Sequence, residues 1–226
     1  MFQKFLAELI GSYILVFVSL ILPAIFNDHS YKAAYYLLVA FSIGFSFVFL
    51  QYTLGYFSGG HFNPIITLAF LIHHRLNFAT FLSYFTAQLL GAFLGAVSIY
   101  VVVVNSLVFR ESNYLNANGY GIHAPNGHSL TAVFILEAIT ASIFCFTFFI
   151  ASKKSSDSLL MGLAVGLCYA VMHLIALPIS NAGLNPAKSI VAALFSPSWA
   201  MQQLWLFILV PFIGSAIGST VANFFD

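Results

Sequence analysis

Hydrophobic residues run in long stretches along most of this sequence, separated by short polar segments. A helix that crosses the hydrocarbon core of a bilayer needs about 20 apolar residues. Six stretches reach this length, at residues 5–26, 35–56, 78–104, 130–151, 159–179 and 203–225. The pattern therefore predicts six transmembrane helices, and an even number places both ends of the chain on the same side of the membrane.

Two further apolar stretches, 64–72 and 186–195, are about half as long as a span, and each begins with an Asn-Pro pair. They are too short to cross a bilayer, and proline is favoured in the first turn of a helix. We therefore expect two re-entrant half-helices, preceded by Asn63 and Asn185.

The two halves of the chain repeat each other. Gly44 precedes Asn63 by as many residues as Gly166 precedes Asn185, and Glu8 and Glu137 lie near the start of the first span of each half. Each copy has three spans, and three is odd, so the second copy enters the membrane from the opposite side. We expect one domain, 1–226, with inverted repeats at roughly 1–104 and 130–226.

Composition limits the functions that are possible. The chain is 61% hydrophobic and 6% charged, with a mean hydropathy of +0.99, which excludes a water-exposed surface over most of the protein. The net charge of +1 provides no basic surface for nucleic acid. Two cysteines without ligand spacing predict no metal site, and the absence of catalytic motifs predicts neither an enzyme nor a cofactor.

Positive charge indicates the orientation in the membrane. Cytoplasmic loops usually carry the excess of lysine and arginine. The side of the termini has Lys4, Arg75, Lys153 and Lys154, whereas the opposite loops have Lys32 and Arg110. Both termini are therefore expected in the cytoplasm.

An inverted pair of half-helices brings two helix N-termini together near the middle of the membrane. Each N-terminus carries roughly half a positive charge and unpaired N–H groups, so the pair repels cations and can donate to a neutral oxygen. The non-helical segments 58–62 and 180–184 add backbone carbonyl groups, which are tolerated at this depth only along a polar cavity. The pattern predicts a pore for a small uncharged molecule that forms hydrogen bonds.

The segments S-G-G-H-F-N-P-I at 58–65 and G-L-N-P-A-K-S at 183–189 resemble the paired Asn-Pro-Ala boxes of the aquaporin (major intrinsic protein) family. The resemblance extends to T-A-Q-L-L-G-A at 86–92 and to 198–214, and it covers nearly the whole chain except 105–129. It implies an all-α membrane protein with six helices and two half-helices around one pore in each subunit. It also implies a homotetramer in the bilayer of a bacterial plasma membrane.

The resemblance also implies roles for the box residues. These are Asn63, Pro64 and Ile65 in the first box, where isoleucine replaces the usual alanine, and Asn185, Pro186 and Ala187 in the second. The two asparagines would donate to one central water, so that the chain of waters reverses direction and protons cannot hop along it.

The family's selectivity constriction maps to Ile43, His173, Ala182 and Lys188. His173 fits the water-selective type, whereas the other three depart from the usual Phe, Thr or Cys, and Arg. Further residues that the resemblance places along the pore or its loops are Gly59, Gly60, His61 and Gly183. It implies that Glu8 and Glu137 hold the pore loops, with a proton relay as the alternative for an intramembrane carboxylate.

The predicted function is a passive water channel that excludes protons and ions. Ile43 and Ala182 are smaller than the family residues, and lysine is a flexible point charge where arginine is a planar fork. A broader channel for glycerol, ammonia or hydrogen peroxide is therefore the alternative, although Ser189 and His173 favour water. A coupled secondary transporter, which also uses inverted repeats, is the third possibility.

Overall fold

The computed structural model describes residues 1–26, 32–105, 115–154 and 157–225. These residues form long and short helices without any β-strand. The long helices are α1 (Phe2–Ile25), α2 (Lys32–Ser58), α4 (Phe78–Val104), α5 (Leu130–Lys154), α6 (Ser158–Ser180) and α8 (Ser198–Asn223). The short ones are α3 (Pro64–Ile72), α7 (Pro186–Leu194) and the 3-10 turn η2 (Gly121–His123).

The six long helices are all long and apolar enough to cross a membrane, and α3 and α7 lie between them in the order expected, so the predicted fold class is confirmed. The largest difference is the start of α8, which begins at Ser198 and not at 203. Polar Gln202 and Gln203 lowered the hydropathy there, although a helix can hold such residues near its end. Gln203 hydrogen-bonds the backbone of Tyr120, which fixes this end of α8.

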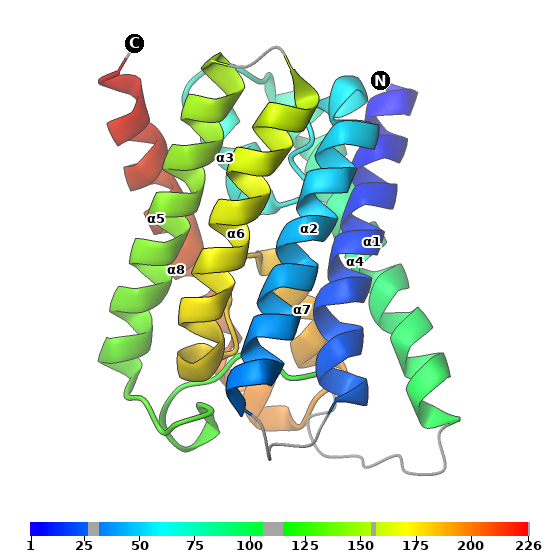
Figure 1. The fold of residues 1–226 in the computed structure, drawn as a ribbon, viewed down its shortest axis with the longest axis vertical. Helices are drawn as coiled ribbons and strands as arrows, with labels where there is room; N and C mark the ends of the chain where they lie inside the picture. The colour runs from blue at the N-terminus through cyan, green and yellow to red at the C-terminus, as the bar shows by residue number, and fades with distance from the viewer. Residues whose placement is uncertain (27–31, 106–114, 155–156, 226) are drawn as a thin grey trace.

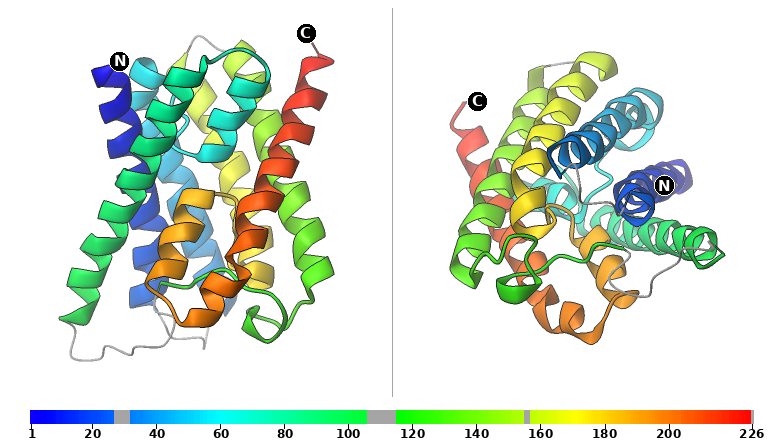
Figure 2. Two further views of the ribbon diagram at one scale, coloured as in Figure 1. Left: turned by 180° about the vertical axis from the view of Figure 1, so that it is seen from behind. Right: turned by 60° about the horizontal axis from the view of Figure 1, so that its bottom comes forward.

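Both chain ends lie at the same end of the molecule, and the two half-helices occupy opposite ends (Figure 1). Seen from behind in Figure 2, α3 and α7 lie in front, one above the other, with α4 on one side of them and α8 on the other. Of the cations that indicated the orientation, Arg110 lies outside the described residues.

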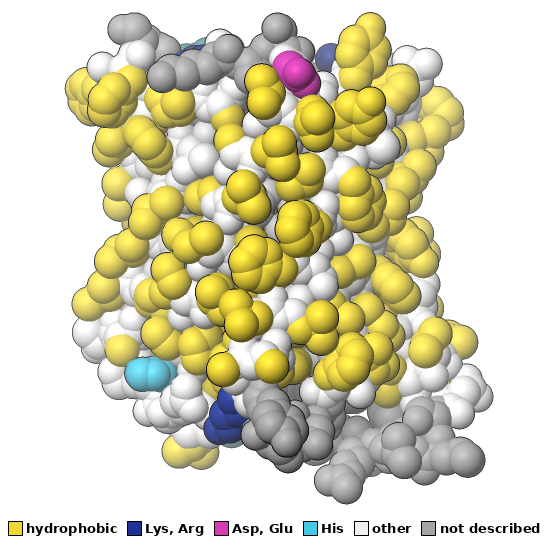
Figure 3. Space-filling model, in the orientation of Figure 1, with side chains coloured by type: hydrophobic (Ala, Val, Ile, Leu, Met, Phe, Trp, Pro, Cys, Tyr) yellow, Lys and Arg dark blue, Asp and Glu magenta, His cyan; other side chains and the backbone are white. Residues whose placement is uncertain are grey.

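The outer surface is apolar between the two ends of the molecule. On the face drawn in Figure 3, hydrophobic side chains cover the middle, and charged side chains appear only near the ends. Large apolar side chains on several helices are exposed, among them Phe45, Leu90, Ile139, Leu167 and Leu209. A surface of this kind fits the hydrocarbon region of a bilayer.

Helices α2 and α6 touch through their backbones where Gly44 meets Gly166. A Cβ atom added to either glycine would lie 2.6 Å from the carbonyl oxygen of the other. Real Cβ atoms do not approach a carbonyl so closely, so any larger residue would push the helices apart. The crossing point fixes how near the pore-facing sides of α2 and α6 come to each other.

Candidate functional site

Both half-helices begin in the same way. Asn63 has extended backbone angles, and its side-chain oxygen accepts from the N–H of Ile65 at 3.1 Å. The Asn185 oxygen accepts from the N–H groups of Ala187 at 3.0 Å and Lys188 at 3.3 Å. A backbone N–H can only donate, so these bonds determine that each amide oxygen faces its helix and each NH₂ group faces away.

The two half-helices meet through these NH₂ groups. Asn63 Nδ2 donates to the carbonyl of Leu184 at 3.0 Å, and Asn185 Nδ2 donates to the carbonyl of Phe62 at 3.3 Å. Each asparagine thus binds the residue that precedes the other asparagine. An NH₂ group has two N–H donors, so each side chain retains a second donor beyond this mutual clasp.

Glu8 anchors the loop before the first half-helix. Its fully buried carboxylate accepts from the Ser58 hydroxyl at 2.6 Å and from the N–H groups of His61 and Phe62 at 3.0 and 2.8 Å. The Gln88 amide adds a fourth hydrogen bond at 2.7 Å. The carboxylate therefore holds the loop backbone in one conformation.

Glu137 does the same for the second loop. It is fully buried, and it accepts from the Ser180 hydroxyl at 2.5 Å and from the N–H groups of Gly183 and Leu184 at 2.7 and 3.1 Å. A Cβ atom on Gly183 would lie 2.6 Å from this carboxylate, which explains why only glycine fits there. Both carboxylates have the geometry of loop anchors.

Left-handed backbone angles shape both loops. Gly59 and Gly60 have φ values of 90° and 68°, and Phe62 follows at 47°. Ala182 and Leu184 have values of 55° and 28°, which are uncommon for residues with a side chain. The anchored N–H groups keep the loops in these conformations, which leaves carbonyl groups of the loops available to other partners.

His61 lies beneath the first asparagine. Its ring is buried and packs against Phe70 and Tyr84, with centroids 4.5 and 5.3 Å apart. Its Nδ1 atom is 3.2 Å from the hydroxyl of Thr67 in α3. The ring is thus fixed between the loop and the half-helix.

The predicted constriction residues Ile43, His173, Ala182 and Lys188 are all buried. Lys188 Nζ donates to the carbonyls of Asn181 and Ala182 at 2.9 and 2.8 Å. The lysine thus lies where loop carbonyls hold its charge. Its third N–H remains beyond these two contacts.

His173 has a defined tautomer. Its Nδ1 atom is 2.9 Å from the carbonyl of Tyr169, which can only accept, so Nδ1 carries the hydrogen. The buried Nε2 atom then has a lone pair and no partner among the described residues. Among the predicted constriction residues, Lys188 on α7 is thus a donor, and His173 Nε2 on α6 is left as an acceptor.

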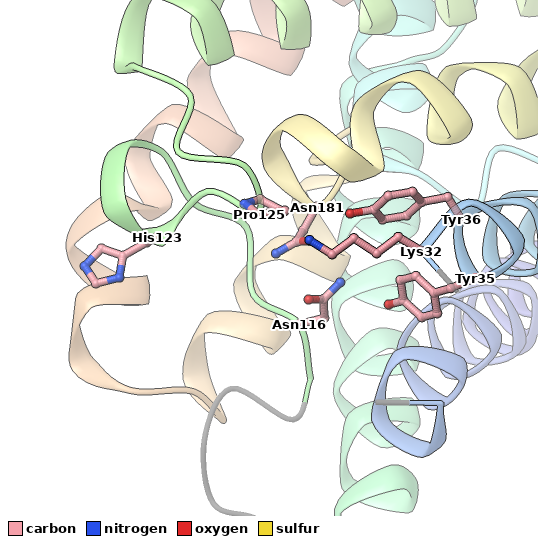
Figure 4. A pocket seen from close by; sticks show the side chains of 7 residues that line it. All are labelled: Lys32, Tyr35, Tyr36, Asn116, His123, Pro125 and Asn181. Atoms are coloured by element: carbon pink, nitrogen blue, oxygen red, sulfur yellow. The ribbon is translucent and has the colours of Figure 1, made fainter. Parts of the chain in front are cut away.

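A polar cavity of about 300 Å³ lies next to the predicted constriction residue Lys188, whose partner Asn181 is part of its lining. Figure 4 shows its lining, which comprises Lys32, Tyr35, Tyr36, Asn116, His123, Pro125 and Asn181. Asn181 links the two regions, because its carbonyl accepts from Lys188. Sequence reasoning treated Lys32 only as a loop cation and did not predict this vestibule.

Asn118 is a further residue that sequence reasoning missed. Its Nδ2 atom donates to the carbonyls of Ser180 and Asn181 at 3.2 and 2.8 Å, and its Oδ1 accepts from Ser189 at 2.9 Å. It belongs to the long loop that the resemblance did not cover, and nothing in the local sequence marks it. The loop reaches back into the protein and braces the second pore segment.

Six membrane-crossing helices around two half-helices, which clasp each other through paired asparagines, define an integral membrane protein of the channel class. The family described as Major intrinsic protein matches residues 1–222, and the chain belongs to this family. The predicted family membership is confirmed. Its aquaporins are channels and not enzymes, in agreement with the prediction for this chain.

Two relatives are aquaporin Z proteins. The one from Photorhabdus laumondii is 31% identical over 98% of this chain and 96% of its own length. The one from Rhodopseudomonas palustris is 32% identical over 97% of this chain and 91% of its own length. Among solved structures, the aquaglyceroporin from Plasmodium falciparum superposes with a TM-score of 0.80 at 19% identity, covering 99% of this chain and 94% of that one. At this identity the superposition supports the fold.

Proposed function

We propose that this protein is a passive water channel that excludes ions and protons. The observation that carries the proposal is the buried pair of asparagines, each of which caps a half-helix and keeps one N–H donor beyond the mutual clasp. Two such donors at the ends of two helix dipoles favour a neutral oxygen and repel a cation. The aquaporin Z relatives support the same solute.

Proton exclusion follows from the direction of these donors. A water that accepts from both Asn63 and Asn185 has its lone pairs occupied, so its hydrogens point toward both ends of the pore. The waters on either side are then oriented in opposite directions, and a proton cannot hop through the chain of waters. The cation Lys188 adds an electrostatic barrier nearer one mouth.

The inverted repeat is part of the proposal. The hydrogen bonds of Glu8 to the first loop correspond to those of Glu137 to the second, and the two asparagine caps correspond as well. We further propose that the protein forms a homotetramer in a plasma membrane with both termini in the cytoplasm. The family resemblance, the apolar outer surface and the distribution of cations support these points.

A broader solute range is the second candidate, because the constriction departs from the water-channel pattern. Ile43 and Ala182 are small, and Lys188 is bound to carbonyls by a compact ammonium group. By size alone this opening favours passage of neutral molecules somewhat larger than water. The lone pair of His173 Nε2 would accept a hydrogen bond from such a solute.

The hydrogen bonds of Glu8 and Glu137 weigh against the alternative of a coupled transporter. A coupled transporter would need a carboxylate or an ion site that changes its state during the cycle. Glu8 and Glu137 are instead held by four and three hydrogen bonds from loop and helix donors. These contacts favour a fixed role for both.

The test is stopped-flow light scattering on proteoliposomes. With an impermeant osmolyte, we expect faster shrinkage than in empty liposomes and a low activation energy, because water crosses without leaving hydrogen-bonding partners. A glycerol gradient in the same vesicles measures the second candidate by the speed of re-swelling. Flux that saturates with solute, or that depends on a proton gradient, would contradict a passive channel.

A further inference from the structure

A cluster of aromatic rings lies inside the bundle, beside the clasp between the two loops. Phe47 on α2 packs against Phe62 of the first loop, with ring centroids 5.9 Å apart. The carbonyl of Phe62 accepts from Asn185, so the cluster begins directly beside the paired asparagines. Phe47 is also one helical turn from the predicted constriction residue Ile43, and residues four apart share a face of a helix. Phe47 therefore occupies the next position along the predicted pore.

Phe47 meets rings from the opposite repeat. Phe144 and Phe148 on α5 lie edge-on to it, with centroids 5.8 and 6.4 Å from its own. Helix α2 packs against α1 and α6, and α5 packs against α6 and α8, so α6 stands between α2 and α5 (Figure 1). Because the three rings are buried, they bridge α2 and α5 on the inner side of α6 and not on its lipid-facing side.

The cluster extends from the asparagines toward the end of the molecule that carries the termini. The ring centroid of Phe148 lies 5.9 Å from that of His61, which the family resemblance places along the pore. It lies equally far from the ring of Phe70 on α3, the half-helix at the end with the termini (Figure 1). Phe47 and Phe148 thus meet between the asparagines and this mouth of the predicted pore.

No space of water size adjoins these rings. Phe47, Phe62 and Phe148 are each 0% exposed, whereas a side chain along a water-filled passage would keep part of its surface accessible to water. Phenylalanine rings also offer no hydrogen-bonding atom to a water that enters. An apolar constriction of this kind excludes water by dewetting, so the passage is closed at this level in the structure.

We propose that Phe47 and Phe148 form a second, apolar constriction that closes the pore between the asparagines and the end with the termini, and that water passes when one of the two rings turns aside. This inference rests on the proposed function as a water channel. The predicted constriction at Lys188 and His173 selects solutes through polar contacts, whereas the second one acts by size and by the lack of any hydrogen-bonding partner. An ion would lose its hydration shell there without compensation, so the second constriction adds to the exclusion of ions.

The decisive variants are Phe47→Leu and Phe148→Leu, each of which replaces a ring by a smaller apolar side chain. We expect each to raise the water permeability per protein by about threefold or more, because the width of the narrowest point sets the flux. The matched control is Phe149→Leu, which removes an equally buried ring from the next residue of α5. Phe149 packs against Phe70 and His73, with centroids 4.7 and 5.4 Å apart, and the control should leave permeability unchanged.

A further variant, Phe47→Met, guards against loss of the fold. Methionine keeps most of the side-chain volume, and its unbranched chain adapts to the space between α2 and α5. We expect this variant to fold and to conduct water faster than the wild type, because a flexible chain moves aside more readily than a ring packed among other rings. All variants are first checked for a single peak in size-exclusion chromatography.

The outcomes separate this inference from the proposed function. Wild-type flux above that of empty liposomes, with no gain in any folded variant of Phe47 or Phe148, would overturn the second constriction and leave the channel function intact. An equal gain in Phe149→Leu would also overturn it, because the effect would then be a general loosening of the helices. A gain confined to Phe47 and Phe148 supports it, whether the wild-type protein conducts slowly or not measurably. No flux in any of these proteins would overturn the channel function, and the second constriction with it.

Discussion

The two pore segments, 58–72 and 180–194, share one framework and differ in the side chains placed on it. In both, a buried glutamate from the first helix of that half accepts from a serine and from two consecutive backbone N–H groups. In both, an asparagine caps a nine-residue half-helix and binds the opposite loop. These contacts position backbone groups, so they are needed in both halves.

The supports behind this framework differ. In the first half, Gln88 on α4 donates to both Glu8 and Thr67. The second half has Pro211 at the matching position, as far before Gly214 as Gln88 is before Gly91, and proline has no side-chain donor. A residue from the long loop, Asn118, braces this segment through carbonyls and a serine instead.

Charge also differs between the segments. The first holds a histidine bonded to Thr67, whereas the second holds Lys188 against two loop carbonyls, one of which belongs to Asn181 in the lining of the polar vestibule. The common part of the two segments positions the asparagines, and we expect the part that differs to set which solutes enter. Changes to shared contacts should therefore cost stability, and changes to the differing ones should alter selectivity.

The largest expected effect comes from removing the glutamates. Glu8→Ala and Glu137→Ala would each leave several buried donors without an acceptor, at about 1–3 kcal/mol for each group. We expect both variants to lose their monodisperse peak in size-exclusion chromatography, with Glu8→Ala the worse because Gln88 also loses one of its two acceptors. Glu8→Gln and Glu137→Gln serve as controls of similar size. Survival of one alanine variant at wild-type stability would show that the two anchors are not equivalent.

A smaller effect is expected at the matching glycines of the helix pairs. A Cβ on Gly91 would meet the carbonyl of Leu9, and a Cβ on Gly214 would meet that of Ala138. Gly91→Ala and Gly214→Ala should each destabilise the fold by about 1–3 kcal/mol through forced separation of the helices. Thermal unfolding in detergent measures both, and Ala92→Gly at the buried residue next to Gly91 tests the opposite change. Clearly unequal losses would argue against equivalent packing in the two halves.

The smallest effect on the fold should come from the constriction, where selectivity changes instead. We expect Lys188→Arg combined with Ile43→Phe to reduce glycerol flux by about fivefold or more, because bulk and a planar donor narrow the opening. Water flux should persist and thermal stability should stay the same. Liposome re-swelling in glycerol measures the change, with Lys188→Arg alone as the intermediate. Unchanged glycerol flux would remove Lys188 and Ile43 from the determinants of solute size.

The fold was predictable because its signals are local and repeated. Apolar stretches of span length located the long helices, and the Asn-Pro pairs located the starts of α3 and α7. The start of α8 was not predictable from hydropathy, because Gln202 and Gln203 are polar and the bond of Gln203 to Tyr120 depends on a loop distant in sequence.

The site was predictable only where a motif marks it. The positions of Asn63 and Asn185 followed from the paired boxes, but their mutual clasp depends on two loops meeting in space. Asn118 escaped notice because it acts through partners far away in sequence. Nothing in the sequence around this loop asparagine marks it as a pore-segment contact.

The contact between Gly44 and Gly166 sets the spacing of α2 and α6, whereas other residues set the chemistry of the pore wall. Of the predicted constriction residues, Ile43 is next to Gly44 on α2, and His173 lies about two turns beyond Gly166 on α6. The backbone contact at the two glycines sets the distance between the helices that hold these two positions. A protein engineer could therefore enlarge the aperture by adding a methyl group at Gly44, while every residue that touches the solute keeps its identity.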